Sequence, residues 1–436
     1  MKNNLRRNQI FVWISNSLMR IVFSLFFGLM VTSCSPTYNS EGLSRKISID
    51  GIMSSNLPPA EKAKELTDSA EEILTTNNFV EANKVASLAV TTNPKDAKAG
   101  FIKSLTECLI KLKGFVIRSK PLFKNDTKAY ENFKKGFSSS LVSEKFFLDG
   151  NPEFFVEKDL QEYFDELIKS FENLNYFLNH NKNAEISIKY LPLFERNLNK
   201  SFVDACELKI TKQFDYEINC PDEKIRHQID LNRADFEELQ LFVNITLIYF
   251  NFLNAYDLTG YLEAFHRYDD RQENDKATFF NDLLNNKSFG LLRENSKINQ
   301  IQNLGIDSML AVRWFIDNPK LACPKGVGAN PNRIGMLFFE GICIDSYFSS
   351  FLNDYMNFFK GVPKDLELKD SGRSIKTKTN YISFTQKPPK DIRDLGPFTF
   401  NPCGDLISVG DPTMAGIFPN QDANTVIPLQ QKKCEK

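Results

Sequence analysis

The residues best suited to acid–base or metal chemistry lie together in the run HRYDDRQEND, which contains His266, Asp269, Asp270 and Asp275. Imidazole and carboxylate groups bind divalent metals and transfer protons. These residues follow one another in a very polar stretch, so a helix would not direct them all to one point. We therefore expect a solvated loop here. Because the chain has no CxxC, GxSxG or HExxH motif, we expect no metal site, no cofactor and no enzymatic activity.

A second run, GVGANPNRIG, begins with two closely spaced glycines that invite comparison with phosphate-binding loops. Gly326 and Gly328 lack both a preceding parallel-sheet strand and the full spacing of such a loop. The run lies between Cys323 and Cys343. A loop closed by a disulfide is the better interpretation.

Cysteine spacing favours local disulfides over a metal site. Seven cysteines follow residue 34. Neighbours in the sequence suggest three bridges, Cys206–Cys220, Cys323–Cys343 and Cys403–Cys434. An exported chain meets an oxidising compartment, whereas in a cytosolic chain the same cysteines would be reduced and buried. Cys108 is left over in an apolar helical stretch, where we expect a small buried hydrophobe rather than a nucleophile.

The N-terminal segment has the residue order of a secretory signal. Basic residues precede an apolar core from Ile21 to Val31, no acidic residue interrupts it, and small residues close it. The core is too short to cross a membrane, since ~30 Å of hydrocarbon needs about 20 apolar residues. Met1 and Met19 are both possible starts, because Met19 would by itself begin a compact signal.

The signal ends in four residues, Val31, Thr32, Ser33 and Cys34, that resemble the bacterial lipobox. The resemblance implies that Cys34 receives a diacylglyceryl thioether, becomes the mature N-terminus and is acylated on its amine. The non-acidic Ser35 implies sorting to the cell outer membrane, on its periplasmic face. The alternative is an ordinary cysteine beside an ordinary cleavage site.

Charge and length limit the class of protein. Residues 1–33 contain four basic residues and no acidic one, so the mature chain would carry 50 Lys plus Arg against 55 Asp plus Glu. A net charge near −5 argues against a nucleic-acid partner. The length exceeds one typical hydrophobic core, so more than one structural unit is expected.

Composition divides the chain into four parts. Residues 1–33 are the signal peptide, and residues 34–56, rich in small and turn-forming residues, suit a flexible tether. Residues 57–365 carry helical periodicity and should form an α-helical domain. Residues 366–436 contain many prolines and glycines with short apolar runs, which indicates an irregular, partly β C-terminal segment.

The helical domain begins with two helices that resemble a tetratricopeptide repeat. They meet at Asn77 and Asn78, and the second ends at Asn93 and Pro94. The matching residues are Leu66, Ala70, Phe79, Ala82, Ala89 and Pro94. Small alanines suit close helix contacts and the proline stops the second helix. The resemblance implies an all-α, TPR-like helical-hairpin stack, with any second repeat degenerate from Gly100 onward. The alternative is a generic helical hairpin.

Further helices are expected in four later stretches. Residues 159–181 carry one apolar stripe. Residues 234–265 begin with a capping box of Asp235 and Glu238 and are apolar nearly all round, which indicates a central buried helix, with a membrane span as the alternative. Two more apolar stretches run from Met309 to Ile316 and from Met336 to Phe359, the latter ended by Gly361 and Pro363.

These features lead us to expect a lipid-anchored periplasmic scaffold or binding protein. Its helical-repeat surface would engage a protein partner at the cell envelope. One alternative is an accessory lipoprotein that captures small molecules for an uptake system, which would need a closed, aromatic-lined pocket. Another is a hydrolase, since paired catalytic carboxylates leave no local spacing in a sequence. The oligomeric state stays open.

Overall fold

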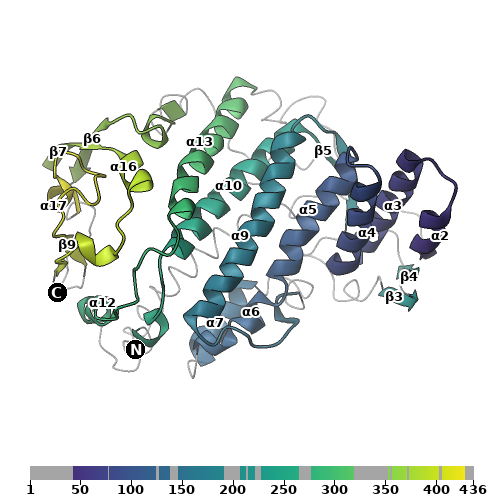
Figure 1. Ribbon diagram of the computed structural model, residues 1–436, viewed down its shortest axis with the longest axis horizontal. Coiled ribbons are helices and arrows are strands. Elements are labelled where there is room, and N and C mark those ends of the chain that lie inside the picture. Colours follow the sequence, from purple (N-terminus) through teal and green to yellow (C-terminus); the bar gives the residue numbers. More distant parts are fainter. Residues whose placement is uncertain are drawn as a thin grey trace. The chain divides into compact units, whose positions relative to one another are not determined.

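The protein is mostly helical with a few small sheets (Figure 1). The computed structural model describes residues 43–76, 78–123, 127–137, 146–190, 207–212, 215–220, 227–264, 276–318, 352–353, 356–370, 373–401 and 405–427. The mostly helical class is confirmed and is consistent with the expected all-α fold, with a few small sheets beside the helices. No described helix is long and apolar enough to cross a membrane.

The chain forms two compact units. Unit 1 comprises residues 1–153, 169–243 and 317–344, and unit 2 comprises residues 154–168, 244–316 and 345–436. The unit boundary falls within two long helices, α9 (Glu157–His180) and α10 (Arg233–Ala255), so each helix contributes residues to both units.

Unit 1 contains three helices that follow one another along the chain: α3 (Pro59–Leu74), α4 (Phe79–Thr92) and α5 (Ala97–Leu112). Each packs against the next (Figure 1). Short polar links separate them, and Asn78 and Asp96 cap α4 and α5 by accepting the backbone N–H of Glu81 and of Ala99. The expected helix–turn–helix over residues 59–92 is therefore confirmed.

Close packing in these helices depends on small side chains. Ala70, Ala82, Ala86 and Ala89 are all 0% exposed, as is Leu66. An alanine allows two helix backbones to approach, because its side chain ends at Cβ. Small residues at helical spacing thus produce the hairpins.

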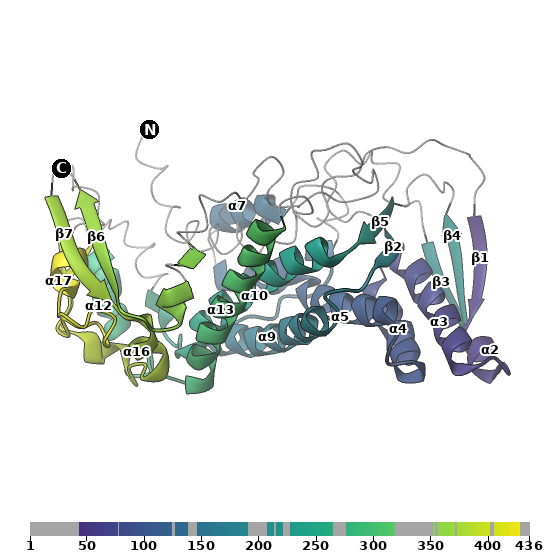
Figure 2. The ribbon, with the colours of Figure 1, turned by 90° about the horizontal axis from the view of Figure 1, so that it is seen from above.

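The tether expectation is wrong for residues 43–54. They form strand β1 (Leu43–Ser48) and helix α2 (Ile49–Ser54). β1 is stabilised by a distant part of the chain, since it pairs antiparallel with β4 (Asp215–Cys220), which also pairs with β3 (Glu207–Lys212). Figure 2 shows these three strands side by side. A partner so remote in sequence leaves no local signal.

A second small sheet also interrupts the helical domain expected over residues 57–365. β2 (Ile186–Tyr190) pairs antiparallel with β5 (His227–Leu231), with Ile188 opposite Ile229. The alternation of polar and apolar residues in both sheets explains why these segments are strands rather than helices. Unit 1 is completed by α6 (Phe115–Arg118), the 3₁₀ turn η2 (Lys120–Phe123) and α7 (Thr127–Phe137).

Helix α10 begins earlier than its expected capping box. Asn232 is the N-cap, since its side chain accepts the Ala234 N–H at 2.9 Å. Asp235 closes the box by accepting the Asn232 N–H at 2.8 Å. The expected pair of Asp235 and Glu238 was one turn too late, because Asn caps a helix as well as Asp does.

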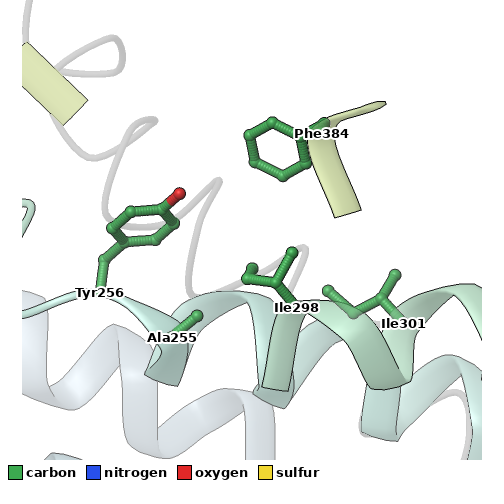
Figure 3. Close-up of a cluster of buried hydrophobic side chains, with 5 residues drawn as sticks. All are labelled: Ala255, Tyr256, Ile298, Ile301 and Phe384. Atoms are coloured by element: carbon green, nitrogen blue, oxygen red, sulfur yellow. The ribbon is translucent and has the colours of Figure 1, made fainter. Parts of the chain in front are cut away.

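Unit 2 is built on α12 (Lys276–Leu284), α13 (Asn295–Asp317) and the unit 2 parts of α9 and α10. Figure 3 shows a cluster of buried apolar side chains formed by Ala255, Tyr256, Ile298, Ile301 and Phe384. Its members come from the end of α10, from α13 and from the C-terminal segment. The C-terminal segment therefore belongs to the core of unit 2.

The expected helix over residues 336–359 is described only at 352–353 and 356–359, which are helical. Its expected end is confirmed. Gly361 has a φ of 73°, and Val362 N–H donates to Asn357 O at 2.9 Å, which is the hydrogen-bond pattern of a glycine C-cap.

The C-terminal segment is more regular than its composition indicated. The charged stretch after residue 363 forms a hairpin of β6 (Lys364–Asp370) and β7 (Arg373–Thr379). The apolar run YISFT lies in helix α16 (Tyr381–Gln386), and shorter elements follow: η5 (Ile392–Leu395), β8 (Thr399–Phe400), β9 (Leu406–Ser408) and α17 (Ala423–Val426). The partly β character expected here is present. The register of the hairpin places Glu367 opposite Lys376, and residue types of opposite charge at facing positions favour strand pairing in a polar run.

Candidate functional site

Most residues singled out from the sequence lie outside the described part of the chain. These are Cys34, Cys206, Cys323, Cys343, Cys403, Cys434, Gly326, Gly328, His266, Asp269, Asp270 and Asp275. Lipidation of Cys34 and the disulfides therefore stay predictions. Among the described residues, no group of three His, Cys, Asp or Glu side chains could hold a metal ion.

Two cysteines have described backbones. Cys220 is the last residue of β4, and its neighbour Asn219 is the register partner of Glu207, the first residue of β3. Cys108 is fully buried in α5, and its thiol lies 3.4 Å from the carbonyl oxygen of Ser170. Burial raises the pKa of the Cys108 thiol well above its usual range. The expectation of a buried small hydrophobe at Cys108 is confirmed.

A buried carboxylate joins three elements of unit 1. Glu71 of α3 has a side chain only 8% exposed. Its Oε1 lies 2.8 Å from Lys98 Nζ of α5 and accepts the backbone N–H of Lys189 of β2 at 2.6 Å. A buried charge is tolerated only when it is paired and hydrogen-bonded, and here both conditions hold.

Strand β2 covers the helices around this carboxylate. It packs against both α3 and α5. Ile186 and Ile188 are 3% and 2% exposed, whereas Ser187 and Lys189 are exposed. We call this surface the α3/α5 face; it comprises Glu71, Lys98 and the parts of α3 and α5 on which β2 lies. The strand contributes two apolar side chains and one backbone donor to it.

Polar side chains fix the relative positions of the three helices. The Thr67 hydroxyl of α3 lies 2.8 Å from a carboxylate oxygen of Asp96, the residue that caps α5. Asn83 of α4 donates to Lys103 O and to Thr106 Oγ1 of α5, both at 2.9 Å. These contacts tie α3 and α4 to α5, so the α3/α5 face has a defined geometry.

The three-stranded sheet is attached to α4 through a phenol. Tyr216 of β4 is 2% exposed, and its hydroxyl donates to Glu81 Oε2 at 2.7 Å. Burial, together with the hydrogen bond to Glu81, raises the pKa of Tyr216 well above its usual range. The phenol therefore acts as a hydrogen-bond donor at neutral pH.

Unit 2 has a charged cluster of its own, here called the Asp165 cluster. It consists of Gln161, Asp165, Asn254, Arg293 and Lys297. The Asp165 carboxylate contacts Lys297 Nζ, accepts Asn254 Nδ2–H at 2.6 Å and lies 3.5 Å from Arg293 Nη2. Gln161 Nε2 donates to Tyr256 O at 2.8 Å. Donors from Asn254, Arg293 and Lys297 therefore converge on the Asp165 carboxylate.

Helix α10, which contributes Asn254 to the Asp165 cluster, also buries polar side chains for which the described residues supply no hydrogen-bond partner. Asn244 and Asn251 are 0% exposed. Within the described part of the chain, both polar atoms of each amide lack a hydrogen-bond partner, as does the Thr246 hydroxyl. Native proteins have few such groups, because each one costs free energy of folding.

Sequence reasoning missed Glu71, Lys98, Asp165 and Lys297. A signal was present only for Glu71, which lies next to Ala70 on a helix whose apolar face was recognised. The spacing of apolar residues predicts which side of a helix packs against its neighbour in the hairpin. Helix α3 also buries polar residues outside that apolar spacing, namely Thr67, Ser69, Glu71 and Glu72. The extra cover comes partly from β2, a strand more than 110 residues further along the chain.

Comparison with known proteins adds no relative. The chain matches no family model, no curated protein and no solved structure.

Proposed function

We propose that the protein is anchored through lipidated Cys34 at the periplasmic face of the outer membrane and holds a protein partner on the stacked helices of unit 1. It acts by binding rather than by catalysis. The observation that carries the proposal is the consecutive packing of α3, α4 and α5. Helical pairs stacked in this way offer an extended surface to a partner.

The residues behind the tetratricopeptide resemblance support this proposal. Leu66, Ala70, Ala82 and Ala89 are all 0% exposed, and Phe79 packs edge-on against Phe146 with ring centroids 5.5 Å apart. Helix α4 ends at Thr92, just before Pro94. On this interpretation α3 and α4 form one TPR-like helical pair, and α5 is the first helix of a degenerate second repeat within unit 1.

Chain length supports a position near the membrane. Strand β1 begins at Leu43, nine residues after Cys34. Nine residues span at most about 30 Å when fully extended. A lipid on Cys34 would therefore keep the start of β1, and with it unit 1, close to the membrane surface.

Membrane fractionation tests the anchor. We expect Cys34→Ala to keep its signal segment and to be absent from the outer-membrane fraction, because the thiol that would carry the lipid is absent. Cys108→Ala is the matched control, since it removes a thiol that is buried in α5. A Cys34→Ala protein that stays membrane-bound and is normally processed would rule the anchor out.

Affinity capture of the tagged protein from membranes tests the binding role. Val80 of α4 is a large apolar residue that is 40% exposed. If the helical surface holds the partner, Val80→Asp should reduce recovery of the captured protein, whereas Lys64→Ala on the exposed side of α3 should not. Equal recovery with both variants would exclude the surface around Val80. A co-purified small molecule without a protein would favour the uptake accessory instead.

A further inference from the structure

Strand β2 lies on the α3/α5 face in the manner of a bound extended peptide. It is five residues long. Alternate side chains, Ile186 and Ile188, are buried, and the side chains between them are exposed. Its backbone is recognised by a side chain, since Glu71 accepts the Lys189 N–H at 2.6 Å. Main-chain hydrogen bonding combined with alternate side-chain burial is how proteins bind peptide strands.

We infer that the α3/α5 face is a binding site for an extended peptide strand with branched apolar residues two positions apart, and that β2 occupies this site in the free protein. The inference rests on the proposed function and deepens it, because it names the class of segment that a partner would present. A partner strand would place its two branched side chains where Ile186 and Ile188 lie, and would donate a backbone N–H to Glu71.

The chemistry of the face sets the specificity. The Glu71 carboxylate binds a backbone N–H, which every residue except proline carries, so it selects an extended main chain rather than a side chain. Lys98, 2.8 Å from the same oxygen, holds the carboxylate in place. The buried Ile positions select β-branched residues, while the side chain at the Lys189 position is exposed to solvent.

The described contacts of β2 are of kinds that a second extended strand can also make. They include antiparallel pairing with β5, burial of Ile186 and Ile188, and the hydrogen bond from the Lys189 N–H to Glu71. A competing strand with the same features could make the same kinds of contact.

Peptide binding to an opened full-length chain tests the inference. Ile186→Ser/Ile188→Ser removes the apolar side chains of β2, and circular dichroism checks that the helices remain. The probe is a fluorescein-labelled peptide of sequence AEISIKY, which reproduces residues 184–190. In fluorescence anisotropy we expect the opened variant to bind it at least about tenfold more tightly than the unaltered chain, since β2 no longer competes.

Two controls identify the contacts. The peptide AESSSKY, which lacks both isoleucines, should not bind. Adding Glu71→Gln to the opened variant should weaken binding about tenfold, because a charge-assisted hydrogen bond is replaced by a neutral one. A folded opened variant that fails to bind AEISIKY, or that binds both peptides equally, would overturn the inference.

Hydrogen exchange on the unaltered chain gives the second measurement if the opened variant does not fold. With AEISIKY at a concentration on the order of 1 mM, the amides of residues 186–190 should exchange faster, and with AESSSKY they should not. Unchanged exchange would also overturn the inference. If either peptide experiment is negative but affinity capture from membranes still depends on Val80, the proposed function stands and only this inference fails. If the peptide binds but no partner is captured through the surface around Val80, the proposed function fails and this inference stands.

Discussion

The hairpins of unit 1 and the helix α10 part of unit 2 both bury polar side chains, but they satisfy them differently. The hydroxyls of Ser69 in α3 and of Thr75, its C-cap, donate to carbonyls of α3 at 2.7 Å, and buried Glu71 has two donors. In α10, Asn254 is tied into the Asp165 cluster, whereas Asn251, three residues earlier, has no hydrogen-bond partner among the described residues.

This difference shows that burial by itself does not indicate how much a polar residue contributes to stability. A buried group that is fully paired is costly to remove, because its partners lose their hydrogen bonds. A buried group without a partner already carries the cost of desolvation, and its removal relieves that cost. Removal of a paired buried group and removal of an unpaired one should therefore change stability in opposite directions.

Removal of the Glu71 carboxylate should give the largest effect. Glu71→Ala leaves Lys98 and the Lys189 N–H without their acceptor, so we expect a loss of about 3 kcal/mol in the free energy of unfolding. Urea titration followed by circular dichroism measures it. Glu65→Ala, an exposed residue of the same helix, should change stability by less than about 0.5 kcal/mol. Equal effects of the two substitutions would show that the buried contacts contribute nothing.

The two asparagines of α10 provide the most direct test of the comparison. Asn254→Leu should destabilise by about 2 kcal/mol, because the Asp165 carboxylate loses a donor. Asn251→Leu should stabilise by about 1 kcal/mol, because it replaces unpaired amide atoms with apolar ones of similar volume. Thermal unfolding of both variants side by side gives the two signs. Destabilisation by Asn251→Leu would mean that its amide has a partner after all.

Gly100 tests the packing of unit 1 in a different way. A Cβ added at Gly100 would lie 2.8 Å from the Phe177 ring of α9. Gly100→Ala should therefore destabilise by about 1 kcal/mol, since overpacking exceeds the gain in helix propensity. Adding Phe177→Leu should recover part of the loss in the same urea titration. Stabilisation by Gly100→Ala alone would show that the ring moves aside freely.

The smallest expected effect concerns an ion pair of unit 2 that is partly exposed to solvent. Arg393 donates to Asp391 and also to the carbonyls of Asn286 and Lys287. The hydrogen bond from Arg393 lowers the pKa of Asp391 below its usual value. The stability that it contributes is present above the pKa of the unfolded chain, about 4, and is lost as the pH falls through the lowered native pKa.

Asp391→Asn should accordingly lower the melting temperature at pH 7 and lower it by less at pH 2. The difference should correspond to less than about 1 kcal/mol, because solvent screens the pair. Asp394→Asn is the neighbouring control. An equal decrease at both pH values would show that the substitution acts through packing and not through charge.

Several helices and helix boundaries could be predicted from local sequence patterns. The helices at 59–74 and 79–92, the 309–316 part of α13, the Asn78 and Gly361 boundaries, and the burial of Cys108 could be predicted because each depends on neighbours within a few turns. Apolar spacing, a capping side chain and a glycine with positive φ are local properties. The mostly helical class follows from the same local signals.

The strands and the α3/α5 face depended on distant partners. β1 is a strand because β4 pairs with it, and Glu71 is a buried acceptor because Lys98 and the Lys189 N–H reach it. Local sequence patterns alone would place residues 43–54 in a tether and Glu71 on the solvent-exposed side of its helix. The Asp165 cluster likewise requires residues of α9, α10 and α13.

The sequence by itself determined the helical periodicity and the helix boundaries at Asn78 and Gly361, because these are encoded over spans of a few to about 20 residues. Only the tertiary structure decided which polar residues are buried and paired. Burial of a charge becomes tolerable only after its partners have been brought to hydrogen-bond distance, and those partners lie on other elements. Glu71 and Asn251 look alike in the sequence, as polar residues within helices, and packing alone gave the first its partners and left the second without any among the described residues.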